Sequence, residues 1–173
     1  MRTRAIEAVK ILNDFISDAV VGTRSIEIFD KLIKGRAISE GTKIGMARMC
    51  YFHLILLLAK WAEFYEKYRS IIPADCVKEC RALNNEVRKL DAPMFRNKYV
   101  GHIWNKDTKR PLTSREISRY MDKITKGDRA AFLHWINNSK NNRYPNSVVS
   151  VISHVRDRLR TEYKIKNEPF EET

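Results

Sequence analysis

Apolar side chains recur three and four positions apart along most of the chain, which is the period of an amphipathic α-helix. Over residues 4–20 this period is carried by Ile6, Val9, Leu12, Ile16 and Val20. Strict alternation of apolar and polar residues is rare, and the chain has six glycines and five prolines. The sequence therefore gives little indication of β-strands. The pattern predicts an all-α protein, an up-and-down helical bundle with extra C-terminal helices.

Breaks in this pattern predict the helix boundaries in the first half of the chain. A first helix over residues 4–20 ends at the sequence VGTRS, and a second over residues 25–33 stops near Gly35. The sequence SEGTK opens a long third helix that ends before Pro73. Its most apolar stretch, residues 51–59, is far too short to span a bilayer. We expect a buried core helix there and no membrane association.

The second half of the chain carries sharper start and stop signals. The sequence ADCVKECRALNNEVRKL predicts a fourth helix, and Asp91 is the expected N-cap of a fifth, with proline in its first turn. A capping box from Thr113 to Glu116 opens a sixth helix, which ends at Gly127. The sequences RAAFLHWINN and NSVVSVISHVRDRLRTEYKIK predict a seventh and an eighth. Without an internal repeat or a long linker, residues 1–173 are expected to form a single domain.

The chain is strongly basic, with 33 Lys and Arg against 21 Asp and Glu and a formal net charge of +12. Such a balance favours a polyanionic partner, and nucleic acid is the leading candidate. The alternative is a basic protein whose lysines only solvate helix faces. Charge alone does not decide between the two.

The three cysteines, Cys50, Cys76 and Cys80, form an odd set in a chain whose first residues do not read as a secretory leader. We therefore expect a cytoplasmic protein with reduced thiols. Cys76 and Cys80 lie one helical turn apart, but no histidine lies near them in the sequence. Two ordinary helix thiols are the expectation, with no metal and no cofactor.

Three arginines precede a histidine by five or six positions. They are Arg48 with His53, Arg129 with His134, and Arg96 with His102. A composition like this one produces about one such pair by chance, so spacing alone proves nothing. The first two pairs lie in apolar helix sequence, where His53 and His134 are expected to be half-buried residues that hold one hydrogen bond.

The third pair has different surroundings. Asn97 directly follows Arg96, and at helical spacing Tyr99 and His102 continue one oblique stripe from Arg96. Gly101 weakens a helix, a cost most easily understood where a ligand or backbone must come close. The chain then turns basic and polar, with Asn105, Lys106, Lys109 and Arg110. This segment reads as a solvated cationic site.

The stretch RNKYVGH, Arg96 to His102, resembles the signature of the HEPN superfamily (higher eukaryotes and prokaryotes nucleotide-binding domain). The signature is an arginine, a polar residue, four variable positions and a histidine in an all-α bundle. With the long helix upstream, the sequence looks most like the abortive-infection HEPN proteins of bacterial phage defence. The resemblance implies one HEPN-like domain and a metal-independent endoribonuclease. It also implies a homodimer with the two motifs facing each other in a basic cleft.

The resemblance also implies a toxin or phage-defence role and a possible antitoxin or inhibitory partner. In HEPN toxins paired with a nucleotidyltransferase antitoxin, a tyrosine two positions after the histidine is modified. This chain has Trp104 there. Silencing by that route is therefore not expected.

The chemistry of RNA cleavage gives these residues roles. Neutral His102 moves a proton to or from the reacting oxygens, and Arg96 stabilises the charge of the transition state. Asn97 orients the phosphate or the imidazole, while Tyr99 and Trp104 either stack on bases or pack in an interface or the core. The remaining candidate RNA contacts are Lys98, Asn105, Lys106, Lys109 and Arg110.

Two other classes of function fit the same sequence. The first is a catalytically silent RNA-binding or adaptor module, in which Arg96 only grips phosphate and His102 caps a helix. The second is a DNA-binding regulator, because LTSREISRYMDKITKGDRAAFLHWI loosely resembles a helix-turn-helix. The nuclease requires a 2′-hydroxyl, the regulator requires duplex DNA, and the adaptor cleaves neither.

Overall fold

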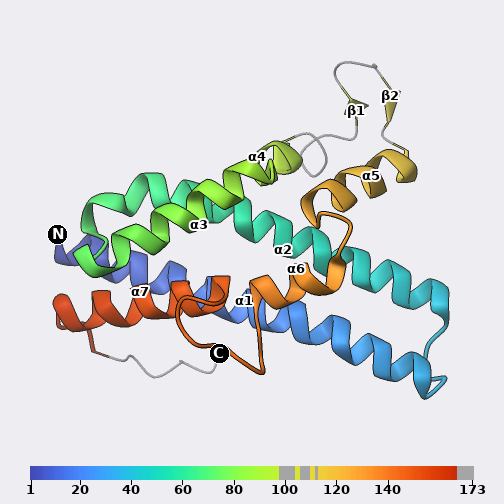
Figure 1. Cartoon of the computed structure of the whole chain (residues 1–173), viewed down its shortest axis with the longest axis horizontal. Helices are drawn as coiled ribbons and strands as arrows, with labels where there is room; N and C mark the ends of the chain where they lie inside the picture. The colour runs from blue at the N-terminus through green and yellow to red at the C-terminus, as the bar shows by residue number, and fades with distance from the viewer. Residues whose placement is uncertain (98–103, 106–109, 112, 167–173) are drawn as a thin grey trace.

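The computed structural model describes residues 1–97, 104–105, 110–111 and 113–166. It confirms the all-α prediction: the chain is a helical bundle (Figure 1). Helices α1 (Arg2–Lys34) and α2 (Glu40–Tyr68) form a long antiparallel hairpin. Helix α3 (Val77–Lys89) lies along α2, and α7 (Val148–Glu162) lies along the N-terminal half of α1. Of the shorter elements between α3 and α7, α4 (Ala92–Phe95) packs on α2, whereas α6 (Arg129–Ile136) contacts α1 and α7.

Helix α1 runs without a break from Arg2 to Lys34. The sequence pattern predicted two helices here, over residues 4–20 and 25–33, and that division is wrong. The expected stop near Gly35 is correct, since Gly35 is the C-cap of α1.

Two side-chain arrangements explain why the sequence VGTRS continues the helix. Gly22 faces α2, and a Cβ at this position would lie 2.9 Å from Cδ2 of Leu54. The glycine therefore permits close packing of the two helices. The buried hydroxyl of Thr23 donates to the carbonyl oxygens of Ala19 and Val20, at 2.9 and 3.0 Å. These two contacts satisfy the Thr23 hydroxyl within α1, so its burial does not interrupt the helix.

Helix α2 spans Glu40–Tyr68 and begins at Ser39, whose hydroxyl accepts from the backbone N–H of Thr42. By length and composition alone, Glu40–Ile71 is long and apolar enough to cross a membrane, with a third of its most apolar window buried. Its central residues nevertheless pack inside the bundle, where Leu54, Leu58 and Trp61 are fully buried. The prediction of a core helix at residues 51–59 is confirmed.

Two short 3-10 helices, η1 (Arg69–Ile71) and η2 (Ala74–Cys76), turn the chain into α3, Val77–Lys89. Helix α4 follows at Ala92–Phe95. Asp91 occupies the predicted N-cap position, but its side chain makes no capping bond. Its backbone is left-handed, with φ of 56°, and its carboxylate accepts from Nζ of Lys123 at 2.7 Å.

After α4, strand β1 (Trp104–Asn105) pairs antiparallel with β2 (Arg110–Pro111). Four paired residues are too few to show the alternation by which strands are recognised in a sequence. Helices α5 (Ser114–Ile124), α6 (Arg129–Ile136) and α7 (Val148–Glu162) complete the described chain. The predicted capping box at the start of α5 and the break at Gly127, with φ of 74°, are both confirmed.

Candidate functional site

Arg96 lies where the short helix α4 crosses the middle of α2. The preceding residue, Phe95, is fully buried and its ring meets that of Phe52 edge-on, with centroids 5.4 Å apart. This contact anchors the end of α4 in the core. The next side chain, that of Arg96, therefore emerges at the surface with its backbone already fixed.

The guanidinium of Arg96 is held by two neighbours. Its Nη1 donates to Oε1 of Glu63 on α2, and its Nε and Nη2 both donate to Oδ1 of Asn97, each at 3.2 Å. About a third of the Arg96 side chain is exposed, as is most of the Glu63 side chain. Ion pairs this exposed contribute little net stability. An anionic ligand can therefore replace the Glu63 carboxylate at modest cost.

Asn97 contacts the guanidinium of Arg96, and its predicted role of orienting the phosphate or the imidazole stays a prediction. It is exposed, and its Oδ1 is turned towards the guanidinium of Arg96. Because the amide oxygen is used in this way, the amide nitrogen remains the group that Asn97 can offer to a phosphate or an imidazole. The structure thus brings together the first two residues of the motif.

The other predicted site residues are described only in part. Lys98, Tyr99, His102, Lys106 and Lys109 lie outside the described residues. The backbones of Trp104 and Asn105 form β1 and that of Arg110 lies in β2. The interpretation of the segment as one continuing helix is limited by β1, since the chain is already extended at Trp104.

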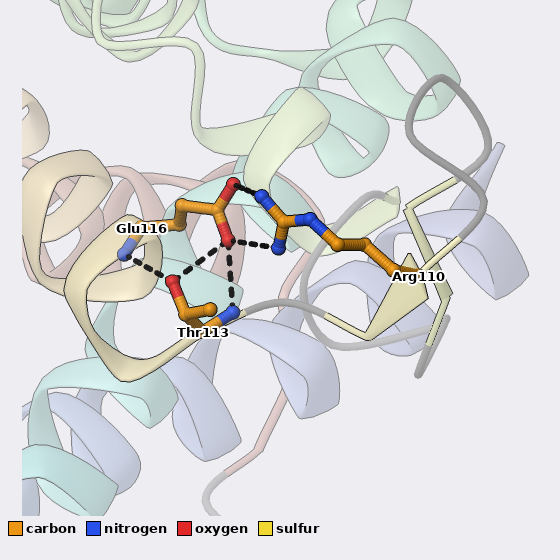
Figure 2. A network of polar contacts seen from close by, with 3 residues as sticks. All are labelled: Arg110, Thr113 and Glu116. Atoms are coloured by element: carbon orange, nitrogen blue, oxygen red, sulfur yellow. Dashed lines mark hydrogen bonds and ion pairs between the residues drawn. The ribbon is translucent and has the colours of Figure 1, made fainter.

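Arg110 joins the hairpin to α5 through a network of polar contacts with Glu116 and Thr113 (Figure 2). Its Nη1 and Nη2 donate to the two carboxylate oxygens of Glu116, each at 2.9 Å. The backbone N–H and the hydroxyl of Thr113 donate to Oε2 of the same carboxylate, at 2.9 and 2.8 Å. This guanidinium therefore has a structural task, and its contact with RNA remains a prediction.

The same network shifts the titration of its members. The Arg110 guanidinium, followed by the N–H and hydroxyl of Thr113, lowers the pKa of Glu116 to about 2. Glu116 in turn raises the pKa of Arg110. The carboxylate is thus ionised over the whole physiological pH range, and it holds β2 against the N-terminus of α5.

A shallow groove lies between α2 and the residues of α3 and α4 that face it, and it includes Glu63, the partner of Arg96. Its wall includes Glu63, Glu66 and Arg88, and Arg88 donates to Glu66 at 2.6 Å. Both arginines at this place, Arg88 and Arg96, therefore face a carboxylate from α2. Sequence reasoning missed the carboxylates, because they lie on a different helix, 33 positions before Arg96 and 22 before Arg88.

The two histidines set aside as structural have different surroundings. His53 is half-buried, as expected, and its Nε2 lies 3.5 Å from Oδ2 of Asp18. His134 is exposed on α6, so the prediction that it is half-buried is wrong. Its helix is short and turns only Phe132 and Ile136 fully into the core.

The cysteines are free, as expected, and Cys76 and Cys80 are fully buried. Burial raises the pKa of Cys76 to about 11 and that of Cys80 to about 12. Next to Cys76 lies a histidine that the sequence did not connect with it, His154 of α7. The separation of 78 positions hid this proximity.

Comparison with known proteins identifies the fold only. No family model matches the chain, and no curated protein matches it either. A solved structure from the mobile metagenome of V. paracholerae, integron cassette protein Vpc_cass2, is similar with a TM-score of 0.76 and 24% sequence identity. The match covers 92% of this chain and 97% of that chain. The likeness therefore extends over the whole bundle.

Proposed function

We propose that this chain is a metal-independent endoribonuclease of the HEPN type, with Arg96 and His102 as its catalytic residues. The observation that carries the proposal is the surface-exposed guanidinium of Arg96 at the end of a core-anchored helix, with the Asn97 amide against it. Because the backbone is fixed here, the charge of Arg96 is held in position. Charge held in position for the transition state is often the largest contribution to catalysis.

The reaction needs only proton transfer and charge stabilisation. The 2′-oxygen of the RNA attacks the adjacent phosphorus, the bond to the 5′-oxygen breaks, and the products end in a 2′,3′-cyclic phosphate and a 5′-hydroxyl. One proton leaves the 2′-hydroxyl and one reaches the departing 5′-oxygen. In this proposal His102 carries one of these protons, since its reference pKa lies near 6.5.

Arg96 stabilises the extra negative charge on the non-bridging oxygens as phosphorus becomes pentacoordinate. Its forked donors suit a phosphate, and they now hold two oxygen acceptors, Oε1 of Glu63 and Oδ1 of Asn97. Phosphate oxygens would take the place of the Glu63 carboxylate. Asn97 would remain as the group that keeps the guanidinium in plane.

A homodimer belongs to the proposal for a chemical reason. One histidine can perform one proton transfer at a time, and two chains supply a second His102 and a second Arg96 to a shared basic cleft. Light scattering at micromolar concentration is expected to give twice the mass of the chain. A fully active monomer would contradict this part of the proposal.

The cell biology follows from the resemblance and the charge. We place the protein in the cytoplasm, as a toxin or phage-defence nuclease that acts on RNA and has a possible inhibitory partner. A net charge of +12 favours binding to RNA that weakens steeply with salt, because bound counterions must be released.

A second candidate function is a catalytically silent RNA-binding or adaptor module. The ion pair of Arg96 with Glu63 favours it, because a guanidinium already paired with a carboxylate can serve architecture alone. The two candidates differ in whether RNA is cut. They agree on fold and on charge.

The deciding experiment is RNA cleavage in EDTA by the wild type and by His102→Ala, with analysis of the product ends. We expect His102→Ala to lower turnover at least about a hundredfold. His134→Ala is the matched control, because that exposed histidine also follows an arginine at short spacing. Equal cleavage by wild type and His102→Ala, or cleavage that requires added metal, would leave the adaptor as the better account.

A further inference from the structure

Three metal-ligating side chains meet between η2 and α7, away from the motif. Asp75 and Cys76 come from η2, and His154 comes from the middle of α7. One ligand atom from each lies within 4.8 Å of the others. A carboxylate, a thiol and an imidazole thus converge from two distant parts of the chain.

Neighbouring side chains orient the carboxylate and the imidazole. Nε of Arg158 donates to Oδ2 of Asp75 at 2.7 Å, so the other oxygen, Oδ1, is left facing Sγ of Cys76 at 3.8 Å. The ring of Tyr144 lies against that of His154, with centroids 4.0 Å apart. Hydrogen bonds such as that from Arg158 to Asp75 orient the ligands of metal sites in proteins.

We infer that Asp75, Cys76 and His154 form a binding site for a divalent transition metal ion of the zinc type. In a tetrahedral zinc site, bonds of about 2.0 to 2.3 Å place neighbouring ligand atoms roughly 3.3 to 3.8 Å apart. The observed separations, 3.8 Å for Sγ to Oδ1 and at most 4.8 Å overall, approach these values. Binding of an ion would draw the three atoms closer together by side-chain rotation.

The donor set selects the class of metal. Sulfur and imidazole ligands suit zinc and cobalt, whereas magnesium and calcium take oxygen ligands. Cys76 is buried, His154 is half-buried and Asp75 is exposed, so an ion would reach the site from the side of Asp75. On binding, the Cys76 thiol loses its proton to solvent and the sulfur binds as thiolate. Three protein ligands leave a fourth position for water.

The location gives the ion a structural task. It would tie the start of α3 to the middle of α7, while Arg96 follows the opposite end of α3. Thirteen helical residues separate the two ends, or about 20 Å. Cleavage at Arg96 is therefore not expected to depend on this ion. The metal site can be tested independently of the proposed nuclease.

Cobalt titration of the full chain, with any affinity tag removed, tests the site. We expect near-ultraviolet absorption from thiolate-to-cobalt charge transfer that saturates at one equivalent and is displaced by zinc. Cys76→Ser should abolish that absorption, and His154→Gln should weaken cobalt affinity at least about tenfold. Zinc should also raise the melting temperature of the wild type, by more than that of His154→Gln, and should not raise that of Cys76→Ser.

Cys50→Ser and His53→Gln are the matched controls, because they remove the same chemistry elsewhere in the bundle. Absence of the charge-transfer absorption from the wild type, its survival in Cys76→Ser, or its loss in Cys50→Ser would each overturn the inference. Circular dichroism checks folding. If Cys76→Ser does not fold, His154→Gln and Asp75→Asn decide the question, since neither side chain is fully buried.

Discussion

The helical frame and the segment that carries the motif are held together in different ways. In the frame, α1, α2, α3 and α7 share one apolar core that includes Leu12, Leu58 and Trp61. In the described part of the segment from Arg96 to Glu116, surface hydrogen bonds between charged groups hold the Arg96 side chain to α2 and β2 to α5. The frame is thus fixed by burial. The motif segment depends on contacts that ligand, pH and salt can change.

The largest effect on stability is expected in the frame. Trp61 is fully buried, and its ring stacks on that of Phe64 with centroids 5.5 Å apart. Trp61→Ala should lower the free energy of unfolding by about 3 to 5 kcal/mol, measured by urea denaturation. Val21→Ala, at an exposed position of α1, should change it by less than about 0.5 kcal/mol. Similar losses of unfolding free energy in Trp61→Ala and Val21→Ala would mean that Trp61 is not a core residue.

Two helical glycines sharpen the account of how α1 and α2 pack. A Cβ at Gly45 meets nothing within 4 Å, whereas a Cβ at Gly22 meets Leu54 at 2.9 Å. Gly45→Ala should therefore stabilise the protein by about 1 kcal/mol. Gly22→Ala should not show that gain, because its methyl group must displace Leu54. Equal stabilisation in thermal melts would argue against the close contact.

In the motif segment, removal of the N-cap of α5 is expected to have the next largest effect on stability. Thr113→Ala removes the hydroxyl that accepts from the backbone N–H of Glu116 and donates to its carboxylate. The free energy of unfolding should fall by about 1 kcal/mol. Thr113→Ser keeps the hydroxyl and should stay close to the wild type. A loss in Thr113→Ser as large as in Thr113→Ala would point to the methyl group instead.

The smallest effect depends on pH. The folded pKa of Glu116, about 2, lies below the ordinary value of 4.5. Its carboxylate therefore stabilises the fold above pH 4.5, and that contribution disappears as pH falls towards 2. Glu116→Gln should lower the melting temperature at pH 7 and match the wild type near pH 2. Glu27→Gln, at an exposed position of α1, is the control and should leave the melting temperature close to that of the wild type at both pH values.

Local patterns in the sequence anticipated much of the fold. Capping at Thr113 and the break at Gly127 depend on a few adjacent residues, so the sequence contained the whole signal. The continuity of α1, by contrast, could not be predicted from a few adjacent residues. Gly22 reads as a break until Leu54, 32 positions away, is known to lie against it.

The contacts of the candidate site also divide into those between neighbours in the chain and those between separate elements. Arg96 and Asn97 are neighbours in the chain, so the sequence places them together, although the hydrogen bond between their side chains was not predicted. Glu63, which holds the same guanidinium, and His154, which lies beside Cys76, reach their partners only through packing of separate helices. No spacing rule in a single sequence reports such contacts, because helix packing brings them together.

The measurement that tests the central claim most directly compares turnover with RNA affinity in Arg96→Ala. If the guanidinium stabilises charge that develops only in the transition state, turnover in EDTA should fall at least about a hundredfold while RNA binding stays within a few-fold of wild type. Arg48→Ala, at an exposed position of α2, should leave both unchanged. Cleavage by Arg96→Ala at the wild-type rate, or a loss confined to binding, would contradict the account.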